Sequence, residues 1–100
     1  MKLIKSELNN EILTVGLQGH IDSNNAADVE AEITEARSSG DIKNVVIDMQ
    51  DLQYISSAGL RVLLKVKKQV GSVKMTGVSD EVYTVLDMTG VADLIEVEKA

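Results

Sequence analysis

Residues 44–70 read NVVIDMQDLQYISSAGLRVLLKVKKQV, and the order of patterns in this segment indicates the type of fold. Its start, 44–48, is a short β-branched run of the kind that forms a buried central strand. The polar run at 49–56 predicts a loop. Over 57–70, leucines and valines recur at helical spacing with basic residues between them, which predicts an amphipathic helix that Gly71 ends. A strand, a loop and a helix in this order are typical of α/β proteins.

The N-terminal part of the sequence predicts a β-hairpin. Two short runs with strand character lie at 3–8 and 11–18. Between them stands the pair Asn9-Asn10, which tolerates left-handed turn geometry. We expect the second strand to end at Gly19.

The remaining segments continue the alternation of helices and strands. Capping residues followed by helical spacing predict a helix at 23–39, before Gly40. A strand is expected at 73–76, a helix at 79–90 and an edge strand at 94–97. The predicted fold is therefore α/β, in the order β-β-α-β-α-β-α-β, with three to four helices on a mixed sheet of four to five strands.

Composition limits the class of protein. One hundred residues with 44% hydrophobic content predict one domain over 1–100. The sequence has no cysteine, no signal-peptide pattern and no apolar run near the roughly 20 residues that span a bilayer. We expect a cytoplasmic protein without membrane insertion, and the polar helix backs indicate a monomer.

Charge is unevenly distributed along the chain. The net charge of −6 argues against nucleic-acid binding, which needs a basic surface. Residues 22–35 hold five acids and no Lys or Arg, whereas 61–74 hold five basic residues and no acid. The favoured interpretation is two solvated helix faces on opposite sides of the domain. The alternative is a polarised surface that orients a protein partner.

Catalytic and metal-binding patterns are scarce. His20 is the only histidine, so the chain has no histidine cluster for a metal, and we expect neither metal nor cofactor. Gly-rich phosphate-binding and dinucleotide-binding motifs are missing. A hydrolase built on Ser57 and His20 is nearly excluded, because no orienting acid accompanies the histidine. We therefore expect no enzymatic activity.

The candidate functional site is the junction before the helix at 57–70. In a parallel sheet this loop lies at the carboxyl edge of the strands, where functional loops gather. The first N–H groups of a helix attract anions, so a phosphate on Ser56 or Ser57 would find donors. Gly59 would leave backbone open to a partner. Local chemistry alone favours a plainer interpretation, in which one serine is the N-cap and Gly59 is a packing residue.

The residues at this junction resemble a known family. The signature helix start of STAS-domain anti-sigma-factor antagonists is similar to YISSAGLRVLL at 54–64. Other family segments resemble GHID at 19–22 and VVID at 45–48. Downstream, GVS at 77–79 and VLDMTGV at 85–91 resemble the third helix and the turn that closes it. The similarity covers nearly the whole chain in the family's order.

The resemblance implies a partner-switching regulator. Such proteins bind an anti-sigma factor that is also a serine kinase, and they thereby release a sigma factor. The kinase uses ATP to phosphorylate a serine at the helix start, which ends binding, and a PP2C-type phosphatase resets the protein. By motif position the acceptor is Ser57, with Ser56 as the second choice. The implied partner-binding residues are Asp22, Ser23, Asp48, Ser56, Ala58, Gly59 and Arg61. We expect Asp22 and Asp48 to lie at the same edge of the sheet, where they would repel a phosphate.

One departure keeps alternatives open. Many family members read Asp-Ser-[Ser/Thr]-Gly, whereas this chain reads Ser56-Ser57-Ala58-Gly59. The missing acid leaves room for a member that binds without being phosphorylated. STAS domains also serve as noncatalytic scaffolds or as regulatory subunits of other complexes, including transporter-associated ones. The sequence identifies neither the kinase, the sigma factor nor the upstream signal.

Overall fold

The centre of the structure is a mixed β-sheet. The computed structural model describes residues 4–9, 11–38 and 42–100, and within them a five-stranded sheet has the order β1-β2-β3-β4-β5. β1 is antiparallel to β2, and all other neighbours are parallel. The strands are β1 (Ile4–Asn9), β2 (Ile12–Ile21), β3 (Asn44–Ile55), β4 (Ser72–Val78) and β5 (Glu96–Lys99). The predicted mixed sheet is confirmed.

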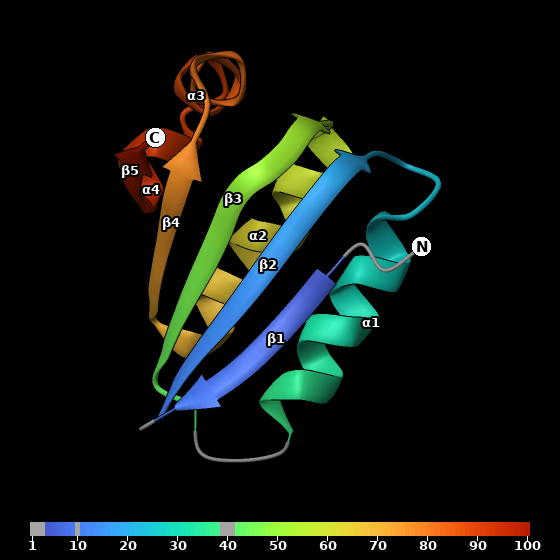
Figure 1. Ribbon diagram of the computed structural model, residues 1–100, viewed down its shortest axis with the longest axis vertical. Helices are drawn as coiled ribbons and strands as arrows, with labels where there is room; N and C mark the ends of the chain where they lie inside the picture. The colour runs from blue at the N-terminus through green and yellow to red at the C-terminus, as the bar shows by residue number, and fades with distance from the viewer. Residues whose placement is uncertain (1–3, 10, 39–41) are drawn as a thin grey trace.

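The helices lie mainly on one side of this sheet. In the described residues they are α1 (Ala26–Arg37), α2 (Ser57–Val70), α3 (Asp80–Met88) and α4 (Val91–Leu94). α1 and α2 lie side by side behind the sheet in Figure 1, whereas the face of β2 and β3 turned toward the viewer is uncovered. α3 lies beyond the end of β4. The short α4, which follows Gly90 in left-handed geometry, is an addition to the predicted order.

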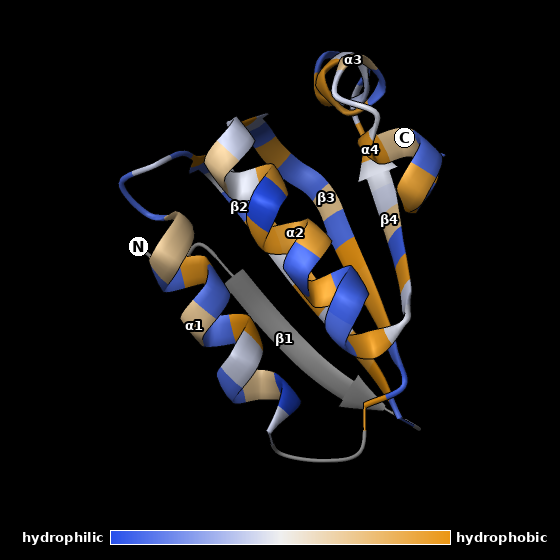
Figure 2. Ribbon diagram, turned by 180° about the vertical axis from the view of Figure 1, so that it is seen from behind, coloured by the Kyte–Doolittle hydropathy of each residue, from blue (hydrophilic) through white to orange (hydrophobic). Residues whose placement is uncertain are grey.

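The core fills the space between the sheet and its helices. From Leu13 to Leu17 every second residue of β2 is buried, and the residues between them are partly exposed, as expected for a sheet covered on one face. The apolar positions of α2 face the strands, and Figure 2 shows them alternating with polar positions along the helix. The buried residues of β2, β3 and α2 are Leu13, Val15, Leu17, Ile21, Val45, Ile47, Met49, Leu52, Ile55, Gly59, Leu60, Val62, Leu63 and Val66.

The prediction of a loop at 49–56 is wrong, because β3 continues to Ile55. Two bulges explain the error. β3 supplies one extra residue opposite Gly16–Gln18 of β2 and another opposite Gly19–His20. Beyond Met49 the buried positions of β3 are therefore three residues apart instead of two. This spacing removes the alternation by which a strand is recognised in a sequence.

The hairpin is confirmed, with two differences in detail. β2 does not end at Gly19 but at Ile21, because Gly19 stays in the ladder opposite Leu52. Among the described residues of the turn, Glu11 has left-handed backbone geometry, with a φ of 67°. Asn10 of the predicted turn lies outside the described residues.

The ends of the other elements differ modestly from the predictions. α1 begins at Ala26 and ends at Arg37, inside the predicted 23–39, and Gly40 lies outside the described residues. α2 has the predicted bounds. β5 lies two residues later than the predicted 94–97, because α4 occupies 91–94.

The acidic and basic helices are neighbours. Lys65 Nζ of α2 lies 3.4 Å from Glu30 Oε1 of α1. Arg37 of α1 also donates a hydrogen bond to Gln69 of α2. The favoured interpretation of two faces on opposite sides of the domain is therefore wrong. The two helices instead lie side by side on one face of the sheet, and their opposite charges partly neutralise each other.

Replacing Lys74 with Met is expected to loosen the β4–β5 edge. Lys74 Nζ lies 2.9 Å from Glu98 and 3.5 Å from Glu96. The hydrogen bond and charge of Glu98, followed by the charge of Glu96, raise the pKa of Lys74 above its ordinary 10.5. Because the folded pKa is raised, this stabilisation is complete below pH 10.5 and is lost as the pH rises through the folded value.

Amide exchange of Val97 checks this prediction. Exchange should be faster in Lys74→Met than in the parent at pH 7, and the difference should shrink in 1 M salt, where the Debye length is about 3 Å. Lys43→Met, which removes an ion pair to Glu11 elsewhere, is the control. Equal exchange in parent and variant would contradict a role of Lys74 in holding β5.

Candidate functional site at the carboxyl edge of the sheet

The candidate site lies where β2 and β3 end and α2 begins. Ile21 and Ile55, the last residues of the two strands, are paired in the sheet. The N–H of Ser56 donates to the Ile21 carbonyl at 2.8 Å, which fixes the start of α2 against the end of β2. The segment after β2 therefore lies beside the helix start, at the upper edge of the sheet in Figure 1. Functional loops gather at this edge in parallel sheets.

Ser56 is the N-cap of α2. Its backbone is extended, with φ −90° and ψ 174°, and its Oγ accepts from the N–H of Gly59 at 3.5 Å. Its carbonyl accepts from the N–H of Leu60 at 3.0 Å. Ser56 is also only partly exposed. Its hydroxyl is therefore committed to the helix start, which satisfies one of the free N–H groups there.

Ser57 differs from Ser56 in exposure and in hydrogen bonding. It is the first residue of α2 and is exposed to solvent. No described residue forms a hydrogen bond with its hydroxyl. Ala58 is partly exposed, and Arg61, one helical turn after Ser57, is exposed. Ser57 is thus the serine of this pair with an accessible and uncommitted hydroxyl.

Gly59 is a packing residue. The expectation that it leaves backbone open to a partner is wrong, because Gly59 is buried. A Cβ at this position would lie 2.7 Å from Cγ1 of Ile55 and 2.8 Å from Cγ2 of Ile21. The missing side chain therefore allows α2 to approach the ends of β2 and β3 closely, and it thereby positions Ser57.

The segment after β2 is ordered by its own side chains. The Asn25 side chain accepts from the N–H of Asp22 at 2.9 Å and donates to the His20 carbonyl at 2.8 Å. Asp22 Oδ1 accepts from the N–H of Asn24 at 2.9 Å. Asp22 is partly exposed and Ser23 is exposed. The structure thus brings the segment of Asp22 and Ser23 to the same edge as Ser56 and Ser57.

Asp48 does not lie at this edge. It pairs with Gly16 and Thr76 in the middle of the sheet, and its carboxylate accepts from the N–H of Gln50 at 3.0 Å. Asp48 precedes Ile55 by seven positions along β3, or roughly 20 Å at the usual rise of a strand. The expectation that Asp22 and Asp48 lie together is wrong, because β3 is longer than its β-branched run.

Two residues near the edge were not predicted as part of the site. His20 and Tyr54 are opposite each other in β2 and β3, and their rings form an edge-to-face contact with centroids 6.1 Å apart. Both side chains are exposed. No hydrogen bond joins His20 to Ser57 among the described residues, so the arrangement lacks the nucleophile–base contact of a hydrolase. The available sequence signal was the rarity of aromatic residues, since the chain has only two.

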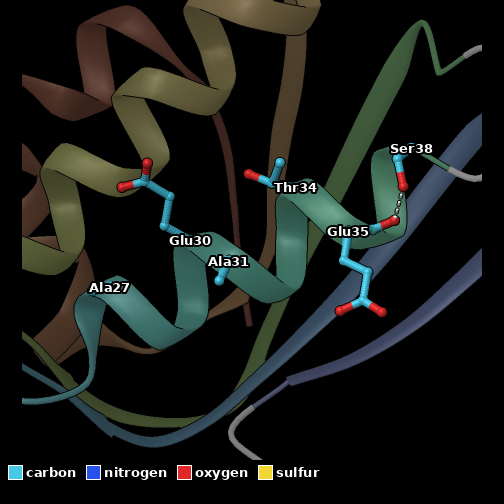
Figure 3. Close-up of a pocket in the computed structure, with 6 residues that line it drawn as sticks. All are labelled: Ala27, Glu30, Ala31, Thr34, Glu35 and Ser38. Atoms are coloured by element: carbon cyan, nitrogen blue, oxygen red, sulfur yellow. Dashed lines mark hydrogen bonds between the residues drawn. The ribbon is translucent and has the colours of Figure 1, made fainter.

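A shallow hollow elsewhere contains none of the predicted site residues. It is formed by small side chains on the outer side of α1, Ala27, Ala31, Thr34 and Ser38, between Glu30 and Glu35 (Figure 3). Ser38 Oγ donates to the Glu35 carbonyl at 2.7 Å. Within the described residues, His, Asp and Glu form no group suited to a metal ion.

The fold and site together define a class of protein. A mixed sheet with helices on one face, and a capped helix start at its carboxyl edge, characterise a small α/β module. The family model described as the STAS domain matches residues 4–100, and the chain belongs to this family. None of the helices formed by the described residues has the length and apolarity that a bilayer crossing requires.

Two similar proteins are both described as anti-sigma factor antagonists. An anti-sigma factor antagonist of Bordetella bronchiseptica, BtrV, is 42% identical over 74 residues, which are 74% of this chain and 62% of the relative. The chain therefore spans less than two thirds of that relative's length. The anti-sigma-B factor antagonist of Bacillus subtilis is 29% identical over 89% of this chain and 84% of its own length.

Solved structures share the fold. Unphosphorylated SpoIIAA, an anti-sigma factor antagonist, is similar with a TM-score of 0.80 at 17% identity, over 94% of this chain and 86% of that one. The phosphorylated form of Bacillus SpoIIAA has a TM-score of 0.71 at 16% identity, over 94% and 89% of the two chains.

Proposed function

We propose that this chain is an anti-sigma factor antagonist. As one STAS domain, it would bind an anti-sigma factor that is also a serine kinase, release a sigma factor, and be switched off by phosphorylation at Ser57. The observation that carries this proposal is the exposed, uncommitted hydroxyl of Ser57 at the first position of α2. The family of the chain and the names of its relatives support the antagonist role.

The helix start favours a phosphate on Ser57. The N–H of Ser56 already donates to the Ile21 carbonyl, and the N–H of Gly59 donates to the Ser56 hydroxyl. Of the four N–H groups that a helix leaves free, those of Ser57 and Ala58 are therefore available to phosphate oxygens. The positive end of the helix dipole also stabilises the added charge. Phosphorylation should leave the fold intact and act on the surface that meets the partner.

The protein acts in this proposal as a substrate and a binding partner, not as a catalyst. A PP2C-type phosphatase would remove the phosphate and restore binding. The nearby carboxylate of Asp22 would oppose a phosphate dianion held in a desolvated contact. The switch is therefore an electrostatic change at the interface.

Phosphate incorporation tests the proposal. The chain is incubated with ATP and the candidate anti-sigma factor kinase, and residues 49–61 are analysed by mass spectrometry. We expect one phosphate on Ser57 in the parent, none in Ser57→Ala, and undiminished labelling in Ser56→Ala if the weakened cap still allows α2 to form. Labelling that persists in Ser57→Ala would move the acceptor to Ser56. Absence of labelling and of binding to any anti-sigma factor, with capture of a membrane complex instead, would overturn the proposal.

A further inference from the structure

Tyr54 is an exposed aromatic residue in a chain that has few of them. Its side chain is 49% exposed, and it lies on the uncovered face of the sheet, close to the end of β3. Figure 1 shows that α2 lies behind this part of β2 and β3. A large ring in such a position contributes little to the core. Aromatic rings of this kind are enriched at the centres of protein interfaces.

A bulge places Tyr54 on this face. Leu52 is buried opposite Gly19, so regular alternation would turn Tyr54 toward the core as well. The extra residue, Gln53, shifts the register, so that Tyr54 lies opposite the exposed His20 and Ile55 takes the buried position opposite Ile21. Bulges commonly re-aim a side chain next to a functional site. Here the bulge exposes an aromatic residue two positions before the helix cap.

His20 braces the tyrosine ring. The two rings meet at an interplanar angle of 87° with centroids 6.1 Å apart, which is a favourable edge-to-face geometry. The contact restricts the ring of Tyr54 before any partner arrives. A pre-ordered anchor loses less conformational entropy on binding than a free side chain does.

The surroundings of Tyr54 are acidic. Neither β2 nor β3 contains Lys or Arg. Asp51 is exposed and lies opposite Gln18. This pair is next to the pair of His20 and Tyr54 on the outward face of the sheet. Asp22 follows the end of β2. A partner that fits this surface therefore has an apolar pocket for the ring and basic side chains around it.

We propose that Tyr54, braced by His20, anchors the anti-sigma factor, and that the contact surface extends from Ser57 around the sheet edge onto the uncovered face of β2 and β3. This inference rests on the proposed function. It adds an apolar anchor and an acidic rim to a site otherwise centred on a serine. It also assigns the partner's surface a pocket lined by apolar groups and rimmed by Lys or Arg.

Affinity measurements with the purified anti-sigma factor test the anchor. Tyr54→Ala should weaken binding at least tenfold, whereas Tyr54→Phe should retain most of the affinity. Asp51→Asn should mainly slow association and reduce its dependence on salt. His20→Ala should weaken binding a few fold in the parent but have little effect in a Tyr54→Ala background, because its role is to hold the ring.

The control is Ile12→Ala. Ile12 is an exposed apolar residue on the same strand and the same face as His20, at the opposite end of β2. This variant should bind as the parent does, and all variants should keep the parental melting temperature within a few degrees. Parental affinity in a folded Tyr54→Ala variant would overturn the anchor while leaving the proposed function standing. If the parent binds no anti-sigma factor, both proposals fail.

Discussion

Replacing Gly59 with alanine is expected to destabilise the fold by about 1–2 kcal/mol. The new Cβ would lie 2.7 Å from Cγ1 of Ile55 and 2.8 Å from Cγ2 of Ile21. Both atoms are close to the backbone of buried strand residues, so neither can move aside freely. Overpacking of this kind costs about 1–3 kcal/mol, and the better helix propensity of alanine returns only about 0.5–1 kcal/mol.

Thermal and denaturant unfolding measure this effect. For a chain of this length the melting temperature should fall by roughly 5–15 °C. Ser57→Ala, an exposed change in the same helical turn, is the control and should alter stability little. In an Ile55→Ala background, which removes the closest atom, Gly59→Ala should cost clearly less. An unchanged melting temperature in the single Gly59→Ala variant would contradict the close packing of α2 on the strand ends.

Helix α2 could be predicted to the residue because several signals agree there. Ser56 caps its start, Gly71 with φ 82° ends it, and its apolar positions follow one stripe. Each signal is local, so the sequence shows it directly. The same holds for the cap of α3 at Ser79, which accepts from the N–H of Val82. Capping chemistry and helical periodicity therefore sufficed for these two elements.

β3 could not be predicted in full, because its second half violates strand alternation. The two bulges are set by the pairing with β2, whose paired residues there lie 32 to 34 positions away along the chain. This error carried over to the site. A strand that ended at Asp48 would place that carboxylate beside Asp22 and would leave Tyr54 in a loop. The serines were located correctly because the helix start depends on local residues alone.

The close packing of Gly59 could not be inferred from the neighbouring sequence either. A glycine in the first turn of a helix is compatible with partner contact or with close packing, and the sequence pattern is the same for both. The choice depends on Ile21 and Ile55, which reach Gly59 only in the folded sheet. A loss of function in a Gly59 variant is therefore expected to arise from a displaced helix start.

Replacing Ser57 with aspartate is expected to weaken binding to the anti-sigma factor at least about a hundredfold, or about 2.7 kcal/mol. In the proposed interface Ser57 is buried by the partner, so a carboxylate there must be desolvated when the partner binds. Asp22 adds repulsion from the same edge. The fold itself should be unaffected, because a negative charge at the first position of α2 is favourable to the helix dipole.

Binding measured at two salt concentrations, with Ser57→Asn as the control, separates charge from shape. Asparagine has nearly the size of aspartate but no charge, so it should weaken binding several fold less than aspartate does. The difference between the two variants should decrease in salt to the extent that the repulsion from Asp22 is screened. Equal affinity of the Asp and Asn variants would show that size, not charge, governs the contact, and the electrostatic switch would then have to be abandoned. Because both variants keep the hydroxyl of Ser56 and its bond to Gly59, neither result can be attributed to loss of the helix cap.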